Sequence, residues 1–150
     1  MKSLLKTNNS FAPTLARVTL GVVMFPHGAQ KVLGWFGGNG FTGTMHTFTQ
    51  QMHIPAVFAV LAIAAEFLGS IGLVVGFLAR VSALGIGVTM AVAINVVHAN
   101  GFFMNWYGNQ KGEGFEYHIL AIGLALIVMI YGAGAASVDG VIAGKAQKKA

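Results

Sequence analysis

The chain has 150 residues, of which 55% are apolar and only 9% are charged, with four acidic residues and no cysteine. So small a charged fraction is typical of a membrane protein and unlike that of a soluble globular domain. The lack of cysteine excludes a disulfide framework, thiol redox chemistry and a thiolate-held cluster within this chain. A net charge of +5 would suit nucleic acid, but the basic residues lie at helix ends and tails, so no nucleic-acid partner is expected.

Four hydrophobic blocks occupy most of the chain. Each has roughly the 20 residues that a helix needs to cross ~30 Å of hydrocarbon. Because lipid requires every backbone polar group to be satisfied internally, the sequence predicts an all-α fold: a single domain over residues 1–150 that forms an integral membrane four-helix bundle. The predicted spans are residues 14–33, 55–78, 81–100 and 117–136.

A short helix is predicted between the first two spans. Glycines within residues 34–40 end the first span, since glycine permits turns that a Cβ would forbid. Phe41, Met45, Phe48 and Met52 then recur at helical spacing, with polar residues on the opposite side. This pattern predicts an amphipathic helix on the outer leaflet, acting either as a cover for helix ends or as a lid over a ligand-binding mouth.

The distribution of basic residues predicts the orientation. With both termini on one side, that side holds seven basic residues and the other holds two, so both termini are predicted to be cytoplasmic in a multi-pass protein of the bacterial inner membrane. The seven are Lys2, Lys6, Arg17, Arg80, Lys145, Lys148 and Lys149, against Lys31 and Lys111 outside. Aromatic residues at the predicted outer boundary are typical of an interfacial belt: Trp35, Phe36, Phe102, Phe103, Trp106, Tyr107 and Tyr117.

Ionisable and polar residues near the outer ends of the spans are predicted to form one cluster. Glu66 lies deep in the second block, where a carboxylate costs on the order of 3 kcal/mol and needs a partner or water. Two readings stay open: a ligand-binding or proton-handling site, or a structural pairing of Glu66 with Lys31 or His27. Placed by depth along the helices, the members are His27, Lys31, Glu66, Asn95, His98, Glu116 and His118.

The third span has small residues four apart on one face. Ala83, Gly87 and Ala91 form a stripe that continues into Asn95 and His98. Small residues allow membrane helices to approach closely. This face is therefore predicted to point into the bundle.

A second polar layer is predicted at the cytoplasmic end. Arg17, Arg80 and Asp139 are interpreted as a structural ionic layer, in which one arginine pairs with the carboxylate and the other reaches toward water. No metal site and no intrinsic cofactor are predicted. A haem is disfavoured because His27 lies ~7 Å deeper than His98, whereas haem needs two imidazoles at matching depth.

An ordered set of short motifs resembles a known family. Glu66 is followed by glycines in the second span, and His98 ends the third span. The other motifs are Arg17-Val-Thr-Leu-Gly21, Phe25-Pro-His27-Gly28-Ala-Gln-Lys31, Gly76-Phe-Leu-Ala-Arg80, Gly114-Phe-Glu116-Tyr117 and Gly132-Ala-Gly134-Ala-Ala-Ser137-Val-Asp139. Taken in this order, over roughly residues 14–140, they resemble the DoxX family of small four-helix membrane proteins. Members of this family resemble subunits of thiosulfate:quinone oxidoreductase, components of membrane redox-stress complexes, or proteins linked to quinone or catechol resistance. The resemblance implies a role of one of these kinds for this chain.

Three functions from different classes follow. The first is a quinone-interacting subunit of a redox or detoxification system, with a quinone or lipid held by aromatic walls and by histidine and carboxylate groups. Its electrons would come from a partner subunit, because no cofactor motif appears in the chain. The second is a structural or assembly subunit, in contact with membrane lipids and with a partner or a second copy. The third is a transporter of a small solute, although no inverted repeat or broken helix pair is evident.

Overall fold

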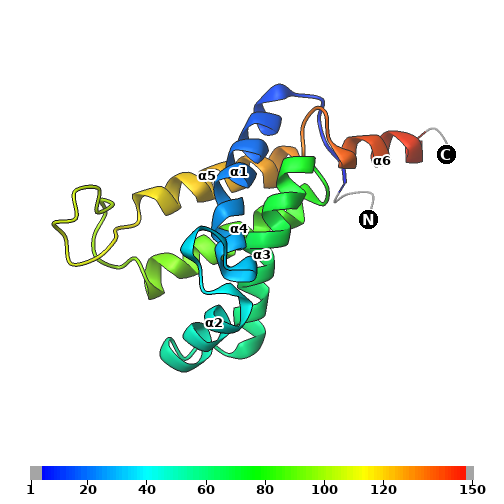
Figure 1. Ribbon diagram of the computed structural model, residues 1–150. Helices are drawn as coiled ribbons and strands as arrows, with labels where there is room; N and C mark the ends of the chain where they lie inside the picture. Colours follow the sequence, from blue (N-terminus) through cyan, green and yellow to red (C-terminus); the bar gives the residue numbers. More distant parts are fainter. Residues whose placement is uncertain (1–4, 148–150) are drawn as a thin grey trace.

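The structure, a computed structural model, describes residues 5–147, so that Lys2, Lys148 and Lys149 lie outside the described residues. The described chain is entirely helical, which confirms the predicted fold class. Its longest helices pack around a shared core (Figure 1). They are α1 (Phe11–Leu33), α3 (Ala56–Val75), α4 (Ala79–Val96) and α5 (Glu116–Tyr131).

Two helices, α3 and α4, are long and apolar enough to cross a membrane. The helix α5 is apolar but shorter, and α1 has 23 residues but includes Arg17, His27 and Lys31. The positions of all four predicted spans therefore coincide with helices. The crossing of a membrane by all four stays a prediction.

Close contact between α1 and α3 depends on glycine. A Cβ added at Gly28 would lie 2.5 Å from the Cα of Phe67, and one added at Gly21 would lie 2.8 Å from the carbonyl oxygen of Ser70. Any larger residue would push the two backbones apart. These two contacts fix the position of α1 along α3, as expected for small residues where membrane helices meet.

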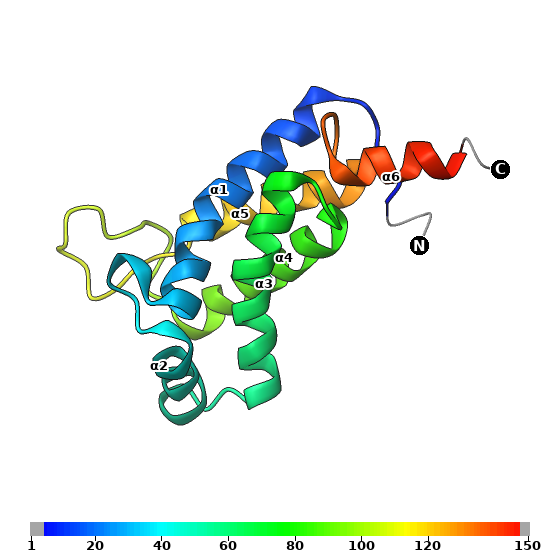
Figure 2. The same cartoon turned by 45° about the vertical axis from the view of Figure 1, so that its right-hand side comes forward.

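A tight turn joins α3 to α4. Gly76 ends α3 in the left-handed conformation (φ 72°), and Leu78 also has a positive φ of 47° before α4 begins. The second predicted span therefore ends at Val75 rather than at residue 78. From this turn the two helices spread apart toward their other ends, as both views show (Figures 1 and 2).

The predicted short helix is present between α1 and α3. A 3₁₀ turn (Trp35–Gly37) precedes α2 (Gly40–His46), and a π-helical turn (Thr47–Gln51) continues α2. Phe48 and Met52 are half-buried on its inner side. A further helix, α6 (Val138–Gln147), follows α5 and has no counterpart among the predicted elements.

Arg17, Arg80 and Asp139 lie at one end of the bundle, but the predicted Arg–carboxylate pair is wrong. Instead, each side chain binds backbone groups at helix ends, which are left unsatisfied within the helix itself. The guanidinium of Arg17, which is 2% exposed, donates hydrogen bonds to carbonyl oxygens after α5 and at the end of α3: Ala133, Ala135, Ala136, Leu73 and Val74.

The other two members of this layer bind different helix ends. The carboxylate of Asp139 accepts hydrogen bonds from the backbone N–H groups of Leu78 (2.8 Å) and Ala79 (2.9 Å), where α4 begins. Arg80 donates to the carbonyl oxygens of Met129 and Ile130 at the end of α5. The layer therefore ties together the ends of α3, α4 and α5.

Candidate functional site

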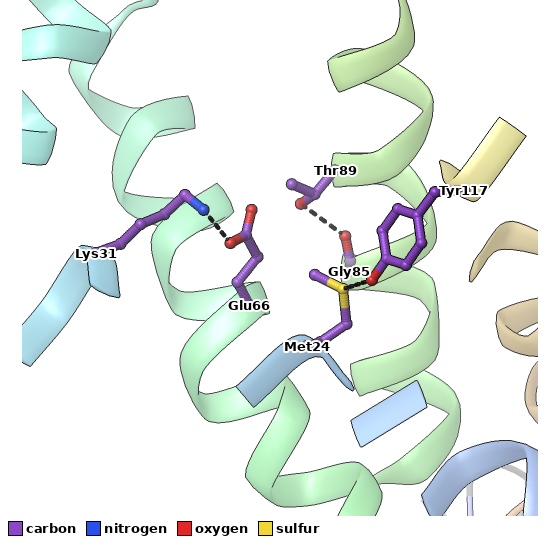
Figure 3. A network of polar contacts seen from close by, with 6 residues as sticks. All are labelled: Met24, Lys31, Glu66, Gly85, Thr89 and Tyr117. Atoms are coloured by element: carbon purple, nitrogen blue, oxygen red, sulfur yellow. Dashed lines mark hydrogen bonds and ion pairs between the residues drawn. The ribbon is translucent and has the colours of Figure 1, made fainter. Parts of the chain in front are cut away.

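A buried ion pair joins α1 to α3. The Nζ atom of Lys31 lies 2.5 Å from Oε2 of Glu66. Figure 3 shows this pair, with the carboxylate reaching into the space between α3 and α4. The Glu66 side chain is 6% exposed and that of Lys31 is 23% exposed. Glu66 therefore has the partner that its depth requires, and that partner is Lys31.

The meeting of these two residues depends on how far α3 extends. Counting along the predicted spans from their ends places Lys31 ~4 Å deep and Glu66 ~16 Å deep. In the structure, Gly28, the sixth residue from the end of α1, packs against Phe67, so the last two turns of α1 lie level with the middle of α3. The first turns of α3 extend beyond the end of α1 (Figure 1). The two helices do not begin at a common level, and this offset brings the ion pair together.

The ion pair lies on the wall of a cavity of about 960 Å³. Most of the lining is apolar and comes from α3 and α4, with contributions from α1 and from the first turn of α5. Phe48, Met52 and Ile54 line it from the segment that follows α2. Across from Glu66 lie Thr89 of α4 and Tyr117 of α5 (Figure 3).

Five of the seven predicted outer-cluster residues line this cavity: His27, Lys31, Glu66, His98 and His118. They come from α1, α3, the end of α4 and α5. His27 is exposed and His118 is buried. The prediction that polar groups from four spans converge therefore holds for these five.

Asn95 does not belong to the cluster. Its side chain is exposed, and its amide nitrogen donates to the carbonyl oxygen of Ala91 on the same helix (2.9 Å). The buried face of α4 consists of Ala79, Ala83, Ile86 and Met90, so the stripe that continues through Ala91 turns outward. The prediction that the whole stripe faces inward is wrong for Ala91 and Asn95, whereas Gly87 packs against Ala125 and His98 lines the cavity.

Glu116 is also absent from the cavity wall. Its Oε1 atom accepts hydrogen bonds from the backbone N–H of Met104 and from the indole Nε1 of Trp106, both at 3.0 Å. These bonds, the backbone one first, hold the pKa of Glu116 below its usual value because they stabilise the ionised carboxylate. Glu116 therefore fastens the loop between α4 and α5 to the start of α5.

Two histidines are in direct contact where the cavity meets the end of α4. The ring centres of His98 and His118 are 4.1 Å apart. The Nδ1 atom of His98 lies 3.3 Å from the carbonyl oxygen of Ala93, whereas Nδ1 of His118 is buried without a hydrogen-bond partner. The pair thus has one ring fixed by the end of α4 and one ring with an unsatisfied nitrogen.

Tyr117 is a cavity residue that the sequence-based interpretation assigned to the aromatic belt. It is half-buried, and its hydroxyl group donates only to the sulfur of Met24 (3.4 Å). Because a thioether is a weak acceptor, this hydroxyl group is available to a better one. The sequence feature that could have predicted this position is that Tyr117 lies in the first turn of the fourth span, directly before His118. The cavity residues Met24 and Thr89 were also missed.

Among the described residues, no group of three or more histidine, aspartate and glutamate side chains is arranged to hold a metal ion. The polar groups on the cavity wall are able to form hydrogen bonds and to exchange protons. The donors are the ammonium group of Lys31 and the hydroxyl group of Tyr117, and the imidazoles can act either as donors or as acceptors.

Comparison with protein families agrees with this architecture. The family model named DoxX matches residues 12–99, which is more than half of the chain. The chain belongs to the DoxX family. The matched segment runs from α1 to just beyond α4 and contains His27, Lys31, Glu66 and His98. The comparisons with curated proteins and with solved structures found no match. Membership of this membrane-associated family agrees with the two membrane-length helices.

Proposed function

We propose that this DoxX protein binds a quinone, or a lipid in its place, within the cavity between α3 and α4. In this proposal it is the quinone-interacting subunit of a redox or detoxification system of the bacterial inner membrane. The observation that carries the proposal is a buried ion pair with three histidines on the wall of an otherwise apolar cavity, beside two helices of membrane length.

The polar groups suit the head of a quinone. Its flat ring carries two carbonyl oxygens, which accept hydrogen bonds. Lys31 and Tyr117 offer donors from opposite sides of the cavity, and His27 offers a third. The volume of about 960 Å³ lies within the usual range for ligand sites, which are concave, mostly apolar and equipped with a few polar groups.

The apolar part of the cavity suits a hydrocarbon tail. It follows α3 and α4 toward their connecting turn, as far as Phe77 and Val81. Gly69 and Gly72 also line this part, where α4 packs closely against α3, because a Cβ added at Gly72 would lie 2.6 Å from the Oγ atom of Ser82. Leu68 and Val88 are among the exposed apolar residues that border it, so a tail would enter from the surrounding lipid.

Electrons would pass to or from a partner subunit. The chain has no cysteine, so its own contribution would be to bind the ring and to exchange protons. Hydrogen bonds between the first and the last described segments support the proposal that both termini lie on the same side of the membrane. The backbone N–H of Ala135 donates to the carbonyl oxygen of Ser10, and that of Gly134 donates to the hydroxyl group of Thr7.

Titration of the purified protein with a short-tailed quinone, ubiquinone-1, tests this proposal. Saturable binding to the wild-type chain is expected, with an affinity at least ~10-fold weaker in His27→Gln, since ~10-fold corresponds to one hydrogen bond to a charged or polar group. A similar loss is expected in Glu66→Gln, which no longer holds the ammonium group of Lys31 at the cavity wall. Matched controls are His46→Gln and Glu113→Gln, which replace exposed residues outside the cavity and should bind as the wild type does. The proposal is wrong if no variant differs or if the wild type does not bind.

The structural-subunit function is the second candidate. It is favoured by the fact that Lys31 and Glu66 satisfy each other directly, as a pairing that fixes α1 against α3 would require. Under this function the cavity would be filled by ordinary lipid. A stoichiometric protein partner that co-purifies with the chain, together with no binding of ubiquinone-1, would support it.

A further inference from the structure

A line of aromatic side chains leads from the interior of the cavity to the end of α4. The ring centre of His27 lies 6.3 Å from that of Tyr117, which lies 5.6 Å from His118, which in turn lies 4.1 Å from His98. All four side chains line the cavity. His27 is one helical turn from Lys31, and His98 is half-buried just beyond the end of α4, so the line connects the ion pair with the edge of the protein.

The least exposed member of this line has an unused nitrogen. His118 is 4% exposed, and its Nδ1 atom has no hydrogen-bond partner. A buried polar atom without a partner is energetically unfavourable. The ring beside it is His98, whose own Nδ1 faces the carbonyl oxygen of Ala93. When the Nδ1–H group of His98 donates a hydrogen bond to that carbonyl oxygen, Nε2 of His98 carries no proton and is an acceptor. The two imidazoles are thus in contact, with an unsatisfied nitrogen on one ring and an acceptor nitrogen on the other.

We propose that His27, Tyr117, His118 and His98 form a proton path from the cavity to the aqueous surface at the end of α4. This inference rests on the proposed function, because it assigns the route by which a hydroxylated aromatic ring in the cavity loses its proton. The O–H bond of the ligand breaks and the electron pair stays on the ligand oxygen. The proton passes along the side chains and leaves His98 for water.

The charges around the path favour its use. At the inner end, Lys31 and Glu66 neutralise each other, so neither charge traps a proton. At the outer end, the carboxylate of Glu116 is held by the loop. Two positive imidazoliums whose ring centres are 4.1 Å apart would repel each other, so the pair favours at most one positive charge.

A pH-jump experiment tests the path with a coloured ligand. The probe is 2-hydroxy-1,4-naphthoquinone, whose absorbance changes when it is deprotonated, bound at saturation to the protein in lipid nanodiscs. In His118→Phe we expect its deprotonation to be at least ~10-fold slower than in the wild type. The control His46→Phe removes an exposed histidine on α2 and should deprotonate the probe at the wild-type rate. An unchanged rate in His118→Phe would overturn the proposal, because water in the cavity would then carry the proton.

A second measurement is independent of any ligand. Histidine nitrogen NMR of the ligand-free protein should show that His98→Gln changes how His118 titrates. His46→Gln should leave it unchanged. Independent titration of the two rings would overturn the path whether or not a quinone binds. Coupled titration without ubiquinone-1 binding would keep the coupled pair and reject the proposed function instead.

Discussion

Replacing Lys31 by methionine should destabilise the protein by about 3–4 kcal/mol at pH 7. Removing one member of a buried ion pair leaves the other uncompensated, at a cost of roughly 3–5 kcal/mol. Glu66 is the more buried partner, with its side chain 6% exposed against 23% for Lys31. A stranded carboxylate can take up a proton instead. For an ordinary glutamate at pH 7 this costs roughly 3.7 kcal/mol, which limits the total loss.

The loss should depend on pH in a definite direction. In Lys31→Met the carboxyl group is protonated in the folded protein and ionised in the unfolded chain, so the folded state binds more protons and the stability falls as pH rises. The deficit relative to the wild type should therefore shrink by about 1.4 kcal/mol for each pH unit between pH 7 and pH 5. Glu66→Gln should be milder, about 1–2 kcal/mol, because the partly exposed Lys31 can turn toward water.

Thermal unfolding in detergent micelles, followed by circular dichroism, measures both effects. For a chain of this length, the loss at pH 7 corresponds to a fall in Tm of about 7–15 °C in Lys31→Met. The pairing argument is refuted if Lys31→Met unfolds at the wild-type temperature. It is equally refuted if the fall in Tm does not change between pH 7 and pH 5.

Four further predictions concern the surrounding structure. Arg17→Lys should reduce the free energy of unfolding by about 3 kcal/mol or more, because one ammonium group cannot replace a planar guanidinium group that binds five carbonyl oxygens. Size-exclusion chromatography should show this loss as a lower yield of folded protein. Asp139→Asn should cost about 1–2 kcal/mol of unfolding free energy and less than Asp139→Ala, because the amide keeps one of the two acceptors at the start of α4. The pKa of Glu116 is lowered in the folded state, so its hydrogen bonds to the loop are fully formed above the usual glutamate pKa and are lost as pH falls through the lowered value. Trp106 fluorescence should report this change, and Glu116→Gln should abolish it. Gly28→Ala should lower both Tm and ubiquinone-1 affinity, because the added methyl group would lie 2.5 Å from the backbone of α3 and would force α1 away from it.

The lengths of the hydrophobic blocks predicted the helices well, because the length of an apolar run can be read directly from the sequence. All four blocks coincide with helices, and the glycine-rich break with its apolar stripe correctly predicted a helix before α3. The ends were less accurate, since local backbone geometry sets them: Gly76 ends α3 in the left-handed conformation. The last helix, α6, was missed because its sequence has no long apolar run.

The candidate site was predictable in part for a related reason. An ionisable residue inside an apolar block needs a partner, so Glu66 pointed to Lys31 and to the nearby histidines. Depth along a helix carries no information on rotation about its axis, and Asn95 therefore appeared to belong to the cluster although it faces outward. Glu116 lies at the correct depth but is bound by loop atoms that no periodicity reveals. The aromatic character of Tyr117 suited a membrane interface equally well, so only the three-dimensional structure places it in the cavity.

Direct extraction of the protein with its surrounding lipid from bacterial membranes tests the central claim most closely. The quinone content of the isolated particles, determined by mass spectrometry, would be compared with that of the bulk membrane. We predict close to one quinone per chain in the wild type, and a loss of this enrichment in Glu66→Gln but not in Glu113→Gln. A wild-type protein with no more quinone than the surrounding lipid would contradict the claim that this cavity binds quinone.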